Sequence, residues 1–550
     1  MPGNDPLRTG WYPDQPGLNP SAGGDCSFGE LWSSAVDGQV YAQPLVDPGA
    51  TPNGTLLVAT ETNNIYGFDA VTGQEQWHRD DLGAPWSSGD LGCTDLFPAV
   101  GVTSTPAIDP VTHTAYLFSK RYEAGTSGPA AWYAHALDLT NSGAEKAGFP
   151  RKIEGFAANV PNLPPGAGAS FDATMHLQRP GLLLMNGVVY AAFGGHCDIP
   201  SYRGWVVGVN AGTGSISTMW TDEAVPPAVN ASPAGGIWHA GGRLVSDKNG
   251  EILLVSGNGV VPPAPLPGAT PPPTLGESVI RLKVQPDGSL QAKDFFSPCN
   301  AQQLSDEDLD IGSGAPLALP DSFGTAAHPH LLMVVGKEGP IYLLNRDDLG
   351  GFQQGSPGSC VDGSGAPDDN LVSKFQLPNA TGVWATPAMW PGEGGSIYLP
   401  YPKFPNGFEG RLTSYGVEKS GGQPTLTVTG QSSDNFGYGS SSAIITSNGG
   451  TSGTALAWIV FFADGSGAGA ELRAYDPTPV NGVLTLRGAW PIGQGAKFNT
   501  PTVSGGRIYV GAVDGHVHAF GVTGASASQA PPPAPRSRVT SNGPGPDREG

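Results

Sequence analysis

The sequence predicts an all-β fold, an eight-bladed β-propeller of four-stranded antiparallel blades, and three observations predict it. The 550 residues include 82 glycines and 54 prolines, so frequent along the chain that long amphipathic helices are nearly excluded. Short apolar runs nevertheless occur throughout, and 38% of the residues are hydrophobic, which is more than a disordered chain carries. The third observation is a repeated unit of strands and turns.

The clearest unit is TLLVATETNNIYGFDAVTGQEQW at 55–77, which predicts three strands, the second ending at Asp69 and the third at Trp77. The segment at 188–220 repeats the order of strand, strand, Thr-Gly turn and terminal Trp220. Related pieces begin at His330, Ala455 and Gly506. Each unit follows a short apolar segment, which we interpret as the innermost strand of a blade.

Eight such innermost strands are expected, and their spacing sets the number of blades. They begin near Tyr41, Ser104, Arg179, His239, Ser313, Ala385, Ser441 and Asn499. Successive spacings run from roughly 56 to 75 residues, which is room for four short strands and variable loops. The spacing therefore predicts eight blades in one ring.

The two ends of the repeat region predict how the ring closes. The last unit has three strands before Gly521, whereas FGELWSSAV at 28–36 is a spare strand ahead of the first unit. Pairing the N-terminal strand into the last blade would remove both open sheet edges. The expected organisation is an N-terminal extension at 1–27, a single propeller at 28–521 with a Pro-rich loop at 261–275, and a disordered Pro-rich tail or linker at 522–550.

Charge and hydropathy exclude several classes of binding partner. The 27 Lys and Arg against 48 Asp and Glu give a net charge of −21, which repels nucleic acid and anionic lipid surfaces. The sequence contains no run of 18 apolar residues, so it predicts no membrane-spanning helix. The first residues lack the basic start and apolar core of a signal peptide, but low Lys content and abundant Ser, Thr, Gly and Pro are typical of secreted bacterial proteins. We expect a secreted, periplasmic or cell-surface protein whose export signal is not part of this sequence.

The five cysteines lie far apart and form no CxxC pair, which argues against a zinc site or a covalently attached haem. They are Cys26, Cys93, Cys197, Cys299 and Cys360. In an oxidising compartment up to two disulfides would form and leave one thiol over. Buried free thiols are the alternative interpretation.

Polar and aromatic residues gather where the predicted innermost strands begin, which in a propeller is around the central channel. Trp238 and His239 open the fourth innermost strand, and Asn258 lies in the SGNG turn after the next strand. Asp310 directly precedes the fifth innermost strand, and Lys337 lies in a GKEG turn. Arg179 and Asp198 lie in the third blade, at its start and in its interior.

With these residues the chain resembles the eight-bladed quinoprotein alcohol dehydrogenases, which hold pyrroloquinoline quinone and Ca²⁺ on the propeller axis. The resemblance covers residues 28–521 and is sharpest at 188–347. It implies that Trp238 stacks under the quinone, and that Asn258, in the turn from Ser256, is a calcium ligand. It also implies Asp310 as catalytic base and Lys337 as the contact to the quinone carbonyls. Asp310 would also serve as a calcium ligand, and Arg179 and His239, which we expect at the same mouth of the channel, would be further cofactor contacts.

The chemistry implied by the resemblance suits these residue types. Oxygen ligands from Asn and Asp suit Ca²⁺, which would polarise the reacting carbonyl. A carboxylate such as Asp310 can remove the alcohol proton, and a cation such as Lys337 can stabilise charge on the reduced quinone. The alternatives are structural: Trp238 as a blade contact like Trp384, Asn258 as a turn residue, Lys337 as an exposed turn residue, and the acidic run around Asp310 as a solvated loop.

Two positions depart from the family. The family has a Glu calcium ligand shortly before an Arg-Gly pair; Arg203 and Gly204 match that pair, but Ile199 stands at the Glu position, so Asp198 would substitute. The family also covers the quinone with a disulfide between adjacent cysteines, whereas here Cys93 follows a glycine. We hypothesise that Cys93 bonds Cys197 instead, because both loops would lie at the same end of the propeller.

Two functional interpretations follow. In the first, the protein oxidises an alcohol or sugar with pyrroloquinoline quinone and Ca²⁺ and passes electrons to a separate acceptor, since no CxxCH haem motif is present. In the second, it is a non-enzymatic secreted propeller with a degenerate cofactor site that binds a surface ligand or serves as a scaffold.

Overall fold

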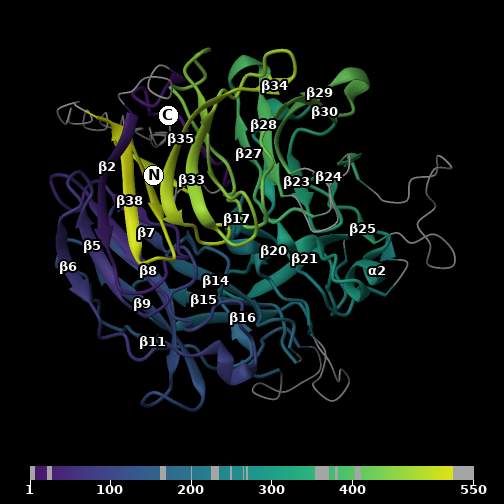
Figure 1. The fold of residues 1–550 in the computed structure, drawn as a ribbon. Coiled ribbons are helices and arrows are strands. Elements are labelled where there is room, and N and C mark those ends of the chain that lie inside the picture. The colour runs from purple at the N-terminus through teal and green to yellow at the C-terminus, as the bar shows by residue number, and fades with distance from the viewer. Residues whose placement is uncertain are drawn as a thin grey trace, which may run out of the picture.

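The computed structural model is a ring of eight small β-sheets, seen in Figure 1 as successive sheets that follow one another in colour around the molecule. The structure describes residues 7–20, 28–160, 169–199, 201–224, 234–247, 250–263, 266–267, 270–352, 371–377, 382–402 and 410–523. Within these residues the eight sheets have four to six strands each, and neighbouring strands of a repeat are antiparallel. The predicted eight-bladed propeller is confirmed.

The first four blades follow one another along the chain, apart from β25, which joins blade 4 from beyond the strands β22–β24 of blade 5. Blade 1 contains β3 (Leu45–Asp47), β4 (Thr55–Ala59), β5 (Ile65–Asp69) and β6 (Glu75–Arg79). Blade 2 contains β7 (Ala107–Asp109), β8 (Thr114–Tyr122), β9 (Ala130–Asp138), β10 (Ala144–Glu145) and β11 (Arg151–Lys152). Blade 3 contains β12 (His176–Leu177), β13 (Leu183–Met185), β14 (Val188–Gly195), β15 (Trp205–Asn210) and β16 (Ile216–Thr221). Blade 4 contains β17 (Val245–Ser246), β18 (Glu251–Val255), β19 (Leu266–Pro267), β20 (Val279–Val284), β21 (Leu290–Ser297) and β25 (Gly351–Phe352).

The remaining blades complete the ring and take in the N-terminal strands. Blade 5 contains β22 (Leu317–Ala318), β23 (Leu331–Val335), β24 (Pro340–Asn345) and β26 (Ser373–Gln376). Blade 6 contains β27 (Ala388–Trp390), β28 (Ser396–Tyr401), β29 (Arg411–Glu418), β30 (Thr425–Ser432) and β34 (Val483–Leu484). Blade 7 contains β1 (Trp11–Tyr12), β31 (Ile444–Thr446), β32 (Leu456–Phe461), β33 (Ala468–Tyr475) and β35 (Leu486–Gln494). Blade 8 contains β36 (Thr502–Ser504), β37 (Arg507–Gly511), β38 (His516–Val522) and β2 (Phe28–Ala35).

Helices are short. They are α2 (Ala301–Asp306) and the 3-10 turns η2 (Ser88–Leu91), η3 (His239–Gly241), η4 (Ile311–Ser313), η5 (Asp321–Phe323), η6 (Gly392–Gly394) and η7 (Ser420–Gly422). Among the residues that the structure describes, no helix is long and apolar enough to cross a membrane.

The repeated Asp- or Asn-containing turn explains why the units look alike in sequence. Asp69 Oδ1 accepts hydrogen bonds from the backbone N–H groups of Val71 and Thr72, at 3.0 and 2.9 Å, and Gly73 follows with a φ of 73°. In blade 3, Asn210 binds the next turn in the same way, and Gly214 has a φ of 70°. A short polar side chain therefore fixes each turn, and a glycine supplies the left-handed residue.

The N-terminal strand closes the ring, as the sequence predicted. β2 pairs antiparallel with β38, from Phe28 opposite Val522 to Ala35 opposite His516. Figure 1 shows the two strands side by side, purple against yellow. Further upstream, Trp11 and Tyr12 pair in parallel with Ile445 and Thr446 in blade 7, so part of the N-terminal extension belongs to the propeller. The predicted tail lies outside the described residues beyond Thr523, and only part of the 261–275 loop is described.

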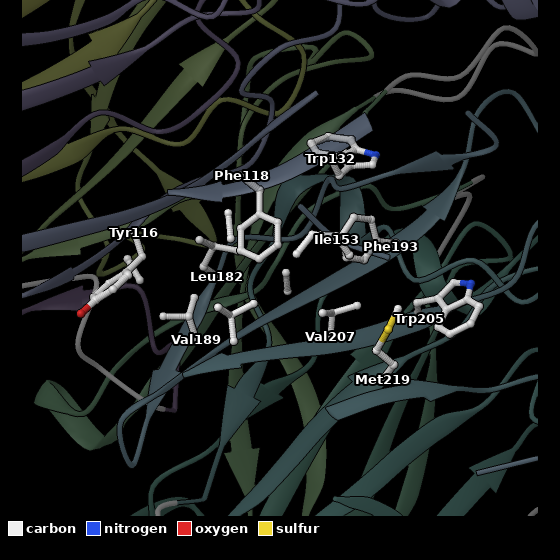
Figure 2. Close-up of a cluster of buried hydrophobic side chains, with 14 of the residues drawn as sticks. Tyr116, Phe118, Trp132, Ile153, Leu182, Val189, Phe193, Trp205, Val207 and Met219 are labelled. Atoms are coloured by element: carbon white, nitrogen blue, oxygen red, sulfur yellow. The ribbon is translucent and has the colours of Figure 1, made fainter. Parts of the chain in front are cut away.

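The hydrophobic core lies between the faces of adjacent blades. Figure 2 shows one such layer between blades 2 and 3, where Phe118 of β8 and Trp132 of β9 meet Phe193 of β14. The Trp132 and Phe193 rings meet edge to face with centroids 5.7 Å apart. Because inner strands such as β4 are buried along their whole length, they need no polar face, whereas the outer strand β6 is largely exposed. This packing holds the inner strands rigidly around the axis.

Candidate functional site

A cavity of about 630 Å³ lies on the propeller axis, at the end where the innermost strands begin. Blades 3 to 5 contribute the polar residues Asp198, Asn258, Asp310 and Lys337 to its wall. Trp238 also lines it, directly before η3. The structure thus brings these five residues together around one space.

Glycine-rich backbone contacts between blades 4 and 5 bring the polar residues together. A Cβ at Gly257 would lie 3.0 Å from Asp310 Oδ2, and a Cβ at Gly312 would lie 2.8 Å from the Gly257 nitrogen. A Cβ at Gly336 would lie 2.4 Å from the Ile311 Cα. These turns pack backbone against backbone, and the Lys337 N–H donates to the Asp310 carbonyl at 3.1 Å. Asn258, Asp310 and Lys337 therefore converge because no side chain separates the turns that carry them.

Asp310 is the centre of the polar group. It is 1% exposed, and its Oδ2 accepts a hydrogen bond of 2.9 Å from Trp238 Nε1. Lys337 Nζ lies 2.6 Å from Asp310 Oδ1 and 2.5 Å from Asp308 Oδ1. Burial raises the pKa of Asp310, and Lys337 opposes that rise. Burial likewise disfavours the charge on Lys337, but Asp310 and Asp308 outweigh it and raise the lysine pKa, so the ammonium stays protonated.

Two further oxygen-bearing side chains face this group. Asn258 donates from Nδ2 to Asp308 Oδ1 at 2.9 Å, whereas its Oδ1 is buried and has no hydrogen-bond partner. Asp198 Oδ1 accepts from the Tyr202 hydroxyl at 2.5 Å. Among the described residues, one group of three His, Cys, Asp or Glu ligands is compact enough for a metal ion: Cys93, Asp95 and Cys197. Because its two sulfurs form a disulfide, this group is not a thiolate site for a metal.

Arg179 lines the cavity but His239 does not. Arg179 is buried and donates from Nη2 to the Lys497 carbonyl at 3.1 Å. His239 was expected to contact a cofactor, but its ring turns away, and its Nε2 accepts from the Val255 N–H at 3.0 Å. Burial lowers the pKa of His239 to about 4, so the ring is neutral. The residue braces the turn that presents Trp238.

A disulfide joins Cys93 to Cys197, the pair hypothesised from the family comparison. The two Cα atoms are 5.8 Å apart, and the bond links residues 104 positions apart in the sequence. Both cysteines line the cavity, so the bond ties the segment before blade 2 to a loop of blade 3 over the axial space. Cys299 is disulfide-bonded as well.

Comparison with known proteins supports the propeller fold. A family model described as outer membrane protein assembly factor BamB matches residues 28–97. Quinohemoprotein alcohol dehydrogenase ADHIIG from Pseudomonas putida HK5 is 12% identical, with a TM-score of 0.58 over 97% of this chain and 81% of its own. Quinohemoprotein alcohol dehydrogenase from Comamonas testosteroni is 14% identical, with a TM-score of 0.56 over 96% of this chain and 81% of its own. The chain shares the fold of these two enzymes, a ring of β-sheet blades. The search of curated protein sequences gave no match.

Sequence reasoning missed the aromatic half of the cavity. Trp384, Tyr438 and Phe498 line it from blades 6 to 8, opposite the polar group. Trp384 and Tyr438 meet edge to face with centroids 5.0 Å apart, and Tyr438 and Phe498 do so at 5.6 Å. Each stands four to six residues before an innermost strand, and Trp238 stands seven residues before β17. That shared position was the signal that would have found them.

Proposed function

We propose that this propeller is an extracytoplasmic oxidoreductase that oxidises an alcohol or sugar with pyrroloquinoline quinone and Ca²⁺ in the axial cavity. One observation carries the proposal: a buried carboxylate, Asp310, is held between the indole of Trp238 and the ammonium of Lys337 beside the orphaned amide oxygen of Asn258. A carboxylate in a wide cavity, oriented by two other groups, is the arrangement expected of a general base.

The residues present fit the quinone and, in part, the cation. A flat polycarboxylate needs an aromatic surface and cations, which Trp238, Arg179, Lys337 and Lys497 offer around the cavity. A hard cation needs oxygen ligands, and Asn258 Oδ1 and the Asp310 carboxylate would hold it. Asp198, which the Tyr202 hydroxyl already engages, would be a third ligand only if that hydrogen bond opened.

When bound, the quinone would supply the carbonyl that is reduced, and Ca²⁺ would polarise it. Asp310 would accept the hydroxyl proton of the substrate on its carboxylate. Trp238 Nε1 would hold that carboxylate in place, and Lys337 would oppose the rise in its pKa that burial causes. The aromatic wall of Trp384, Tyr438 and Phe498 would contact the carbon skeleton of the substrate and exclude water.

A titration tests this function. The purified protein is titrated with pyrroloquinoline quinone, with and without Ca²⁺, by equilibrium dialysis, and dye reduction is then followed over a panel of alcohols and sugars. We expect calcium-dependent binding at micromolar quinone and turnover of part of the panel. Trp238→Ala should weaken binding at least tenfold, whereas Trp32→Ala, in β2 on the ring closure, should not. Absence of binding at micromolar quinone would end the enzymatic proposal.

A second candidate is a ligand-binding propeller without chemistry. Lys337 already neutralises Asp308 and Asp310, and Ile199 stands where the related enzymes carry a calcium-binding Glu. The family model that matches blade 1 is described as an assembly factor, which supports a role in binding another protein. The same titration separates the candidates, because this one predicts neither calcium-dependent quinone binding nor turnover. The disulfides support an oxidising, extracytoplasmic location for either candidate.

A further inference from the structure

A second, smaller cavity lies deeper on the axis and is lined by three arginines. Its volume is about 90 Å³, and Arg8, Arg179 and Arg243 all contribute to its wall. Tyr41, Arg179 and Phe498 line both this cavity and the larger one, so they stand between the two spaces. None of the described residues that line the small cavity is acidic.

The three guanidinium groups come from separate parts of the fold. Arg8 belongs to the N-terminal segment, and its Nε and Nη2 donate to the carbonyls of Leu244 and Leu182 at 3.2 and 3.3 Å. The same segment binds blade 7 through β1. The N-terminal segment therefore lines part of the small cavity and contributes a positive charge to it.

Two of the arginines retain unused hydrogen-bond donors. Arg243 Nη2 donates to Gln43 Oε1 at 2.9 Å, but its Nη1 is buried and has no partner. Among the described residues, Arg179 makes one hydrogen bond, to the Lys497 carbonyl. Within the part of the chain that the structure describes, neither forms an ion pair with a carboxylate. Burying a charge without a counter-charge costs free energy, so binding of an anion here would stabilise the two arginines.

Glycines make room for both side chains. A Cβ at Gly181 would lie 2.5 Å from Arg243 Cγ, and a Cβ at Gly241 would lie 2.5 Å from Arg179 Nη1. Gly241 also has a φ of 86°. The backbone is therefore shaped around these two arginines.

Burial disfavours the charged form of these arginines, and a bound anion would offset that free-energy cost. Burial lowers the pKa of Arg243 to about 10, with Tyr12 opposing that shift. It also lowers the pKa of Arg179, with Glu61 and Tyr41 opposing. Arginine side chains stay protonated at neutral pH, and Glu61 acts on Arg179 without forming an ion pair with it.

We propose that the small axial cavity is a binding site for a small oxyanion, such as phosphate, sulfate or a carboxylate group. Guanidinium groups match oxyanions in geometry because they donate two parallel hydrogen bonds. Lining hydroxyl groups of Thr105, Ser442 and Thr500 add further donors. The volume accommodates several water molecules and therefore a tetrahedral ion of this class. The site is separate from the proposed quinone site, with Arg179 as the shared boundary.

Anion titration without any quinone tests the site. Thermal unfolding of the full chain is followed with rising phosphate at constant ionic strength, kept with sodium chloride. We expect a saturable rise in Tm with half-saturation at about 1 mM. Arg243→Met should weaken half-saturation at least tenfold, whereas Lys497→Met, which removes a cation of the large cavity alone, should not. Because phosphate stabilises proteins unspecifically as well, an equal response of wild type and Arg243→Met would overturn the proposal.

A second measurement does not depend on the folding of a variant. Wild-type crystals soaked in about 10 mM selenate should show an anomalous peak between Arg179 and Arg243; an empty cavity would overturn the proposal. Adding pyrroloquinoline quinone to the phosphate titration identifies the source of the anion. Loss of the phosphate response would assign the site to a carboxylate of a molecule in the large cavity, and an unchanged response would assign it to a free ion.

Discussion

The contacts of the Asp310 carboxylate depend on its negative charge, as expected of a general base. Its Oδ2 accepts the Trp238 N–H, and its Oδ1 pairs with Lys337, so Asp310→Asn keeps the volume and removes the charge. If the enzymatic proposal holds, we expect turnover to fall about 10²- to 10⁴-fold, because a positioned base contributes that much, while quinone affinity changes less than threefold.

The control for Asp310 is its neighbour Asp308, which also contacts Lys337 but is exposed. Asp308→Asn should retain turnover within about threefold, since an exposed carboxylate is hydrated and not oriented toward a substrate. Dye-reduction kinetics and equilibrium dialysis measure both effects. Retention of more than a tenth of wild-type turnover by Asp310→Asn would remove that residue from its role.

Glu61 makes the stability of the propeller depend on pH. It is 1% exposed, and burial raises its pKa to about 7 against hydrogen bonds from the Gly101 N–H and the Thr103 hydroxyl. A raised carboxyl pKa favours the protonated folded state, so its contribution to stability is complete below pH 4.5 and is lost as pH rises through about 7.

Glu61→Gln should therefore remove this loss. Between pH 5 and pH 8 we expect the wild type to lose about 2 to 3 kcal/mol of unfolding free energy relative to the variant. Denaturant unfolding at the two pH values measures the difference, in which the other titrating groups cancel. Glu75→Gln, at an exposed carboxyl on β6, should show no such trend. A constant difference between wild type and Glu61→Gln would refute the assignment.

At the scale of elements, the turns that carry the site depend on the absence of side chains. Gly312→Ala would place a methyl group 2.8 Å from the backbone nitrogen of Gly257, where neither turn can yield without moving Asp310. We expect a loss of about 1 to 3 kcal/mol in stability, typical of overpacking, together with weaker quinone binding. Gly450→Ala is the matched control, because a Cβ there meets nothing within 4 Å. Chemical unfolding compares the two, and equal stabilities would contradict the tight packing.

The same turns show how far sequence reasoning reaches into the site. The blade repeat predicted that Trp238, Asn258, Asp310 and Lys337 would meet, because the start of each inner strand has a fixed place around the axis. It failed for His239 because the backbone there makes a turn with φ values of 49°, 44° and 86° at His239, Ala240 and Gly241. That turn decides which of two adjacent side chains faces the cavity, and no periodicity in the sequence encodes it.

The short strands outside the repeat, β25 and β34, could not be predicted from the sequence either. β25 pairs in parallel with β21, and β34 pairs in parallel with β30, each after a long excursion of the chain. Both are two-residue strands without alternating hydrophobicity, so their pairing depends on tertiary contacts alone. The small arginine cavity could not be predicted from the sequence for a similar reason. Arg8, Arg179 and Arg243 are brought together by ring closure and not by their spacing in the sequence.

For the whole molecule, ring closure by β2 is the feature that makes one domain of eight blades. β2 covers the edge of β38, and Phe28 packs against Trp458 and Trp490 of blade 7 with centroids 5.1 and 4.6 Å away. On the other side, Trp32 Nε1 donates to the Val71 carbonyl of blade 1 at 3.1 Å. The strand thus joins the last blade to both of its neighbours.

Two N-terminal deletions separate this closing strand from the segment before it. Removing residues 1–27 takes away β1 and Arg8 but leaves β2, so we expect a monomer with a lower Tm and no phosphate response. Removing residues 1–36 takes away β2, exposes the edge of β38 and uncovers the aromatic rings of blade 7, so we expect aggregation and loss of a cooperative transition. Light scattering after gel filtration and thermal unfolding distinguish the two. A monomeric 1–36 deletion with the Tm of the 1–27 deletion would mean that the seven complete blades hold the ring without its closing strand.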